Sequence, residues 1–185
     1  EQVLQKLFAV LEKGKLARSC ALEVLEVPVA KRLQLLTMKP ILYVLNRKNG
    51  VVNVDLEAGE RWRTLQQFFT ETGAHYVFVD AAVERELNDV HDNERDQFRR
   101  ELGIAESGVD ALIRAGYETL DLISFFTTGE KETRAWTVTR GATAPEAAGA
   151  IHTDFKEKFI RAEVIAWDAL LAAGSWSAAR EKGLV

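Results

Sequence analysis

Two short stretches decide the fold of this chain: Ile41-Leu42-Tyr43-Val44-Leu45 and His75-Tyr76-Val77-Phe78-Val79. Each is a largely apolar run, which is typical of a strand covered on both faces. Between them, residues 57–72 carry large apolar side chains at helical spacing until Gly73 ends the pattern. The sequence therefore predicts a β-α-β unit whose two strands run parallel.

Polar or small residues follow both predicted strands. Asn46-Arg47-Lys48-Asn49 follows the first strand, and Asp80-Ala81-Ala82 follows the second. The carboxyl ends of parallel strands meet at one edge of the sheet, where open α/β sheets bind ligands. The candidate ligand-binding residues are therefore Asn46, Arg47, Asn49, Asp80, Ala81 and Ala82. The alternative interpretation is a plain polar turn after a strand.

The run from Asn46 to Asn49 carries information about which base could bind. GTPases place N-K-x-D after such a strand, and its aspartate accepts two N–H groups from guanine. Asn49 stands at the fourth position here, and its amide combines one acceptor oxygen with a donor NH2 group. It cannot accept both guanine N–H groups, so the pattern disfavours guanine and suits the donor–acceptor edge of adenine better.

The first 38 residues are net basic and predict a helix, a loop and a second helix. Leu4, Leu7, Phe8 and Leu11 place one apolar face on the first helix, which Gly14 ends. No capping residue precedes this helix, so we expect it to continue a longer chain. A second helix is predicted over residues 29–36, with Leu33 and Leu36 on one face, and Pro40 ends it.

The region after residue 106 predicts a helix and then a small mixed unit. Ser107 and Asp110 favour a helix that extends to Phe125-Phe126, and residues 133–140 favour a strand. Thr143 with Glu146 then forms a capping box that opens a helix ending near residue 151. A further strand over residues 159–165 and two short helices complete the outline of a β-grasp. The strands are too few to close such a sheet, so we expect a truncated unit.

Composition limits the class of protein. With 47% hydrophobic and 28% charged residues, the chain is of ordinary globular composition. A single cysteine excludes an internal disulfide and favours a reducing compartment, so we expect a cytoplasmic protein. The net charge of −4 excludes a globally basic nucleic-acid binder. No apolar run reaches the roughly 18 residues that span a bilayer, so we expect no membrane partner.

No complete catalytic apparatus is present in these 185 residues. The sequence contains neither G-x-x-x-x-G-K-[ST] nor G-x-S-x-G, and its three histidines are not spaced as metal ligands. His152-Thr153-Asp154 could serve acid–base chemistry or simply end a helix. Lys156, Lys158 and Arg161 could contact RNA phosphates or form a salt-bridged surface. The three candidates for base stacking, which could equally pack in the core, are Trp136, Trp167 and Trp176.

Three stretches resemble the YchF family of Obg-related P-loop ATPases. They are residues 35–46, residues 80–87, and the run that begins Phe125-Phe126-Thr127-Thr128-Gly129 and continues through residue 155 and again over 159–165. The resemblance covers residues 7–185. The family's base-binding pattern is N-x-x-E, in which Asn46 matches and Arg47 stands where the next residue contacts the base. Asn49 departs from the glutamate, and Asp80 departs from the small or polar residue usual at its position.

The resemblance implies an α/β plus α+β fold in three parts. Residues 1–38 would be the end of a helical coiled-coil insertion and its return. Residues 39–128 would be the C-terminal half of a nucleotide-binding domain with a partial P-loop GTPase-like parallel sheet. Residues 129–185 would be a truncated, ubiquitin-like TGS domain. The P-loop and the Mg²⁺ ligands would lie in a missing N-terminal half.

Two functions follow from this resemblance. The first is the C-terminal part of a ribosome-associated ATPase that binds and hydrolyses ATP when full-length, with GTP disfavoured and this chain alone inactive. The second is a non-enzymatic module that docks on the ribosome, on rRNA or ribosomal protein, through its TGS and helical parts.

Overall fold

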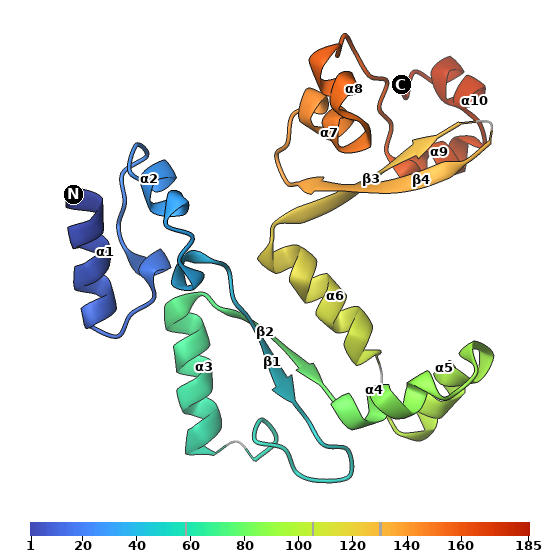
Figure 1. Cartoon of the computed structure of the whole chain (residues 1–185). Coiled ribbons are helices and arrows are strands. Elements are labelled where there is room, and N and C mark those ends of the chain that lie inside the picture. Colours follow the sequence, from blue (N-terminus) through green and yellow to red (C-terminus); the bar gives the residue numbers. More distant parts are fainter. Residues whose placement is uncertain (58, 105, 130) are drawn as a thin grey trace. The chain divides into compact units, whose positions relative to one another are not determined.

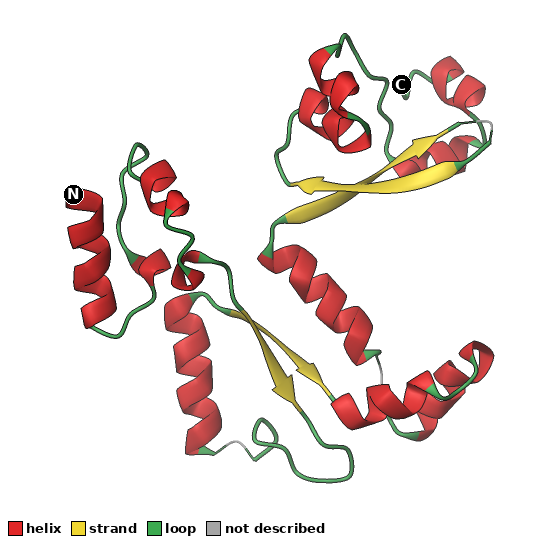
Figure 2. Cartoon of the chain, in the orientation of Figure 1, coloured by secondary structure: helices red, strands yellow, loops and turns green. Residues whose placement is uncertain are grey.

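The computed structural model describes residues 1–57, 59–104, 106–129 and 131–185. These form two compact units, Glu1–Thr119 and Leu120–Val185 (Figure 1). Helices predominate in both units, and each unit has one two-stranded sheet (Figure 2). None of the helices formed by the described residues has the length and apolar character needed to cross a bilayer.

The sheet of the first unit confirms the predicted β-α-β arrangement. Strands β1 (Leu42–Asn46) and β2 (His75–Val79) are parallel, with Leu42 opposite His75 and Asn46 opposite Val79. Helix α3 (Glu60–Thr72) connects them and ends at Gly73, whose φ of +60° places it in the left-handed region. The predicted helix began at residue 57, and its residue 58 lies outside the described residues.

An aromatic cluster joins α3 to one face of this sheet. Phe69 is 6% exposed, and its ring stacks on Tyr76 at 4.4 Å and meets Tyr43 at 5.6 Å between centroids. Trp62 covers Tyr76 and Phe78 at 6.0 and 5.7 Å. Because side chains alternate along a strand, Val77 and Val79 face the other way, and helix α6 packs against β2 there.

The N-terminal segment confirms the first predicted helix and corrects the second. Helix α1 (Gln2–Glu12) packs its buried Val3 and Leu7 against Ala17 and Ala30. Helix α2 (Val27–Arg32) ends four residues before the predicted boundary. The chain turns at Gln34, whose φ is +49°, so the helix cannot continue. Two short 3-10 helices, Ala17–Ser19 and Leu36–Met38, complete this segment.

Three further helices complete the first unit, and the last of them corrects the sequence analysis. They are α4 (Ala81–Asn88), α5 (Asp92–Glu101) and α6 (Gly108–Thr119). The prediction continued α6 to Phe126, but Asp121 has a φ of +52° and the chain then enters a strand. Side chains along residues 122–128 alternate between half-buried and exposed, a period that favours a strand over a helix.

The second unit contains an antiparallel strand pair. Strand β3 (Leu122–Thr128) pairs with β4 (Thr133–Thr139), which confirms the strand predicted at 133–140. The boundary between the two compact units falls between Thr119 and Leu120, before β3 begins. Residue 130, inside the longest stretch of family resemblance, lies outside the described residues.

Four short helices follow β4. They are α7 (Ala144–Ile151), α8 (Thr153–Glu157), α9 (Trp167–Ala173) and α10 (Trp176–Glu181). The predicted capping box is confirmed, because Glu146 accepts from the Thr143 backbone N–H at 2.7 Å. The strand predicted at 159–165 is wrong for this structure. That segment pairs with no strand among the described residues and leaves Ile160 91% exposed.

Candidate functional site

The carboxyl ends of β1 and β2 are joined by a side chain. The Asn46 Oδ1 atom, at the end of β1, accepts a hydrogen bond from the Ala81 backbone N–H at 3.1 Å. The Arg47 backbone N–H continues the ladder by donating to the Val79 carbonyl at 2.9 Å. The structure therefore brings the polar run after β1 and the run after β2 to the same edge of the sheet.

Asp80 connects this edge to helix α4. Its Oδ1 atom caps the helix by accepting from the N–H groups of Ala82 and Val83, both at 3.1 Å. Its Oδ2 atom accepts from the Asn49 backbone N–H at 2.6 Å. One carboxylate thus fixes the start of α4 and the loop after β1 together, because its two oxygens point in two directions.

Contacts within the chain hold the Arg47 side chain. The guanidinium carbon sits 3.7 Å from the centre of the Phe78 ring, and the group pairs with the Asp55 carboxylate. The Arg47 side chain is still 40% exposed. Arg47 therefore presents only part of its side chain to a ligand, since an aromatic ring and an acid hold it from other sides.

Asn49 uses its amide oxygen locally. Its Oδ1 atom accepts from the Gly50 backbone N–H at 2.9 Å, and Gly50 takes the positive φ of +76° that the turn requires. Within the side chain of Asn49, only this oxygen makes a hydrogen bond with the described residues, so its NH2 group has no partner among them. Ala82, the last predicted site residue, contributes its backbone N–H to the Asp80 cap and is exposed.

A cleft of about 710 Å³ is lined by three of the predicted site residues, Arg47, Asn49 and Asp80, whereas Asn46, Ala81 and Ala82 lie outside its lining. One wall is the loop after β1, from Arg47 to Asn53, and another is β2 with the start of α4. The far wall comes from residues 102–104 and 106–108 and the first turn of α6. The volume falls in the range of small-molecule sites. The described residues include no group of acidic, histidine or cysteine side chains that could hold a metal ion.

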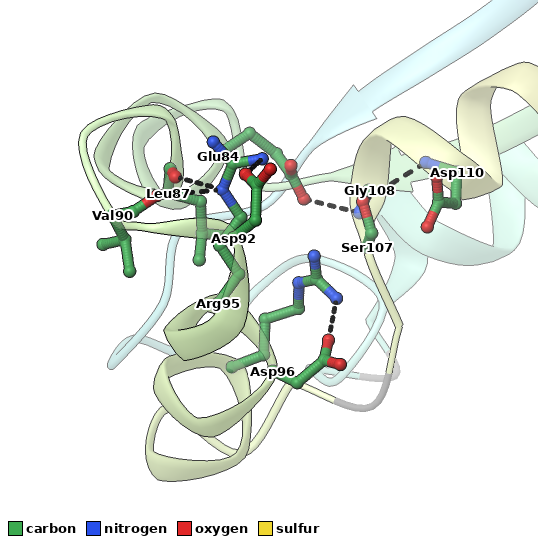
Figure 3. A network of polar contacts seen from close by, with 10 residues as sticks. Glu84, Leu87, Val90, Asp92, Arg95, Asp96, Ser107, Gly108 and Asp110 are labelled. Carbon is green, nitrogen blue, oxygen red and sulfur yellow. Dashed lines mark hydrogen bonds and ion pairs between the residues drawn. The ribbon is translucent and has the colours of Figure 1, made fainter.

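The far wall is tied to α4 by a carboxylate (Figure 3). Glu84 Oε1 accepts from the Gly108 backbone N–H at 2.5 Å, and the Ser107 hydroxyl accepts from Asp110 at the start of α6. On the neighbouring α5, the Arg95 side chain donates to the carbonyls of Leu87 and Val90. The position of this wall therefore depends on polar contacts between helices.

Several residues of this edge are absent from the sequence-based expectation. Asn53 and Asp55 lie seven and nine positions after Asn46, in a stretch that reads only as a polar turn. Phe78 reads as an ordinary strand residue, and Glu84 as an exposed helical acid. Asn and Asp close to a glycine do favour side-chain contacts with a turn, which was the available signal for Asn53.

The other candidates from the sequence lie in the second unit. His152 Nδ1 accepts from the Asp154 N–H at 3.2 Å, so this pair joins α7 to α8 as the helix-end interpretation holds. Trp136 donates its indole N–H to the Thr127 hydroxyl at 2.8 Å, and Trp167 is 65% exposed. The exposed basic residues of this unit include Lys156, Lys158 and Arg161.

Comparison with known proteins gives the family. Residues 122–185 match YchF-GTPase_C, described as a protein of unknown function (DUF933). The chain is 42% identical over 184 residues to the Ribosome-binding ATPase YchF of Bacillus subtilis, covering 100% of this chain and 50% of that protein. The relative of the same name from Haemophilus influenzae is 42% identical over 182 residues, covering 98% and 49%. The chain belongs to the YchF family.

A solved structure supports this YchF assignment. The structure of the Schizosaccharomyces pombe YchF GTPase superposes with a TM-score of 0.81 at 29% identity, covering 98% of this chain and 48% of that chain. The chain spans about half the length of the YchF relatives it matches. The matched family region begins at the first residue of β3, so it coincides with nearly all of the second unit.

Proposed function

We propose that this chain forms the base-binding side of a nucleotide pocket in a ribosome-associated ATPase. The hydrogen bond between Asn46 Oδ1 and the Ala81 N–H carries the proposal. It ties together the two loops that leave the carboxyl ends of neighbouring parallel strands, where ligands bind in open α/β sheets. The cleft lined by Arg47, Asn49 and Asp80, which belong to these two loops, has the size for a nucleoside and a mixture of polar and apolar walls.

The pocket favours ATP over GTP in this proposal. Guanine recognition by the loop after β1 needs a side chain that accepts two N–H groups. Asn49 has one acceptor oxygen, and that oxygen already accepts from Gly50. The free NH2 group suits the acceptor N1 of adenine. The relatives from bacteria are named ATPases and the fission-yeast structure is named a GTPase, so the base preference is a matter for experiment.

ATP hydrolysis would belong to the whole protein. Phosphoryl transfer needs Mg²⁺ and fixed donors around the phosphates. The 185 residues contain no G-x-x-x-x-G-K-[ST] loop. We propose that residues outside this chain hold the phosphates and Mg²⁺, that residues 39–128 are the second half of the nucleotide domain, and that this chain alone does not hydrolyse ATP.

The ribosome is the proposed partner. The relatives are named ribosome-binding, and this chain would contact rRNA or ribosomal protein through two parts. These are residues 129–185, proposed as part of a TGS domain of the β-grasp type, and residues 1–38, proposed as the end of a helical insertion. A second function, docking without enzymology, is favoured by the exposed cations Lys156, Lys158 and Arg161 in the unit that matches the family model.

Nucleotide titration of the ¹⁵N-labelled chain tests the pocket. ATP with Mg²⁺ is expected to shift the amide signals of residues 46–51 and of Ala81, and GTP is expected to shift them less at equal concentration. Signals in β3 and β4 serve as the internal control. Absence of any response to ATP, or a stronger response to GTP, would contradict the proposed pocket.

Ribosome binding tests the docking function separately. Co-sedimentation of the chain with ribosomes is expected without nucleotide and is expected to weaken as salt rises, because phosphate contacts release counterions. Replacing Lys156, Lys158 and Arg161 together by Gln should lower the salt dependence. Ribosome binding that changes neither with salt concentration nor with this triple substitution would contradict a docking role for these cations.

A further inference from the structure

We propose that Asn53 and Asp55 are positioning residues that hold the base loop, residues 46–51, in its binding shape before a nucleotide arrives. The inference rests on the proposed function of this edge. It concerns two residues that face the loop from within the same turn, and neither is among the six residues expected to meet the ligand.

Asn53 bridges the base loop with its whole amide group. Its Oδ1 atom accepts from the Lys48 N–H at 2.9 Å. Its Nδ2 atom donates to the Lys48 carbonyl at 3.0 Å and to the Val51 carbonyl at 3.2 Å. The side chain thus bonds to the backbone of Lys48 and Val51 as a neighbouring strand would.

Asp55 holds the first side chain of the loop. Its carboxylate is only 8% exposed and pairs with the guanidinium of Arg47. The same guanidinium lies over the Phe78 ring, so an acid and an aromatic face together set its plane. Arg47 lines the cleft, whereas Asp55 lies outside its lining. Asp55 therefore acts on a ligand through Arg47.

These contacts give the base loop two independent supports. Asp80 holds Asn49 from the side of α4, and Asn53 holds Lys48 and Val51 from the other side. A loop that is already ordered loses less conformational entropy when it binds, so these supports raise affinity.

The test compares Asn53→Ala and Asp55→Asn with the matched control Asn93→Ala, which removes an exposed asparagine of α5. The probe is ATP with Mg²⁺, followed by amide shifts in the whole chain. We expect Asn53→Ala to weaken ATP binding about tenfold and Asp55→Asn about threefold, each 1.4 kcal/mol being a factor of ten. The control should stay within about twofold of the original chain.

Two further measurements separate positioning from a general structural role. ¹⁵N relaxation should show new mobility confined to residues 47–51 in Asn53→Ala, with amide exchange in β1 and β2 unchanged. Asn53→Asp keeps the acceptor for the Lys48 N–H but turns a carboxylate oxygen towards the carbonyls of Lys48 and Val51, so it should also weaken ATP binding. This variant also serves if Asn53→Ala fails to fold.

The outcomes distinguish failure of the proposed function from failure of this inference. If the original chain does not respond to ATP, the proposed function fails and this inference fails with it. If the original chain responds but Asn53→Asp, Asn53→Ala and Asp55→Asn bind ATP as tightly as it does, the inference alone is overturned. Loss of affinity with increased loop mobility and an intact sheet supports it.

Discussion

The two strand pairs of this chain are stabilised by different contacts. The parallel pair β1–β2 has no direct turn, and its strands are joined by α3, whose Phe69 and Trp62 bury the aromatic face of the sheet. The antiparallel pair β3–β4 joins two strands that follow one another in the chain and leaves Phe126 57% exposed. A parallel pair needs a crossover element, whereas a hairpin does not.

The difference extends to the polar contacts. At the end of β1–β2, side chains join segments more than thirty positions apart, as Asn46 does with Ala81 and Asp80 with Asn49. In the second unit, the capping contacts of Glu146, His152 and Ser175 reach two or three positions along the chain. The edge at the end of β1 and β2 is therefore held by contacts between distant segments, and the helices of the second unit begin on local signals.

The largest expected effect comes from removing the aromatic cover of β1–β2. Phe69→Ala should lower the stability of the first unit by about 3–5 kcal/mol, because the buried ring leaves a cavity beside Tyr43 and Tyr76. Phe126→Ala, at an exposed position on β3, should cost about 1 kcal/mol. Amide exchange in the two sheets measures both; equal losses would remove the contrast between the pairs.

The next effect compares two helix caps. Asp80→Ala should cost about 2 kcal/mol, because it leaves the N–H groups of Ala82 and Val83 without their cap and frees Asn49. Ser175→Ala removes the local cap of α10 and should cost about 1 kcal/mol. Amide exchange in α4 and α10 reports the costs. Broadening of the Asn49 signal only in Asp80→Ala would show that Asp80, besides capping α4, also holds the backbone of Asn49 in place.

A smaller effect of opposite sign distinguishes two glycines of α6. A Cβ at Gly108 would lie 3.0 Å from Glu84 Oε1 and from Val79 Cγ1, so Gly108→Ala should destabilise the first unit by about 1 kcal/mol. A Cβ at Gly116 would meet nothing within 4 Å, so Gly116→Ala should stabilise it by about 0.5–1 kcal/mol. Urea unfolding followed by amide signals of β2 measures both. The same sign for both would mean that the Glu84 contact does not constrain this wall.

The smallest expected effect is a pH dependence in the second unit. Hydrogen bonds from the Thr143 N–H and hydroxyl lower the pKa of Glu146 below its ordinary value of 4.5. The stabilisation is therefore complete above the ordinary pKa and is lost as pH falls through the lowered one. Amide exchange in α7 should be faster in Glu146→Gln than in the original chain at pH 6, and the difference should shrink towards pH 3. A difference that stays constant would exclude the carboxylate as its cause.

Sequence reasoning located the shared edge of β1 and β2 but not its internal supports. The runs 41–45 and 75–79 indicate strands by their own composition, and chain direction then requires their ends to meet, as Asn46 and Ala81 do. Nothing in the neighbours of Arg47 indicates that it would pair with Asp55 over Phe78. That contact depends on the path of the loop that brings Asp55 back to Arg47. The pattern of side chains along the sequence does not specify this path.

The two errors in strand assignment have one physical origin. Residues 122–128 carry spacings that suit a helix over Leu120 and Ile123 and also a period of two, and pairing with β4 decides for the strand. Residues 159–165 have strand composition, but no described segment pairs with them. A strand is stabilised by pairing with a neighbouring strand. Strand-like composition alone therefore does not ensure that a segment forms a strand.

The sequence by itself determined three properties of this protein: the β-α-β unit, the shared edge of its strands, and the single acceptor oxygen that the Asn49 amide offers. These follow from side-chain period, chain direction and functional groups, which are local properties. Only the tertiary structure decided that Asp80 would serve α4 and the base loop together, that Asp55 would hold Arg47, and that β3 would belong to the second unit. Those outcomes depend on groups distant in sequence coming within hydrogen-bonding or pairing distance, and that is set by the packing of the whole chain.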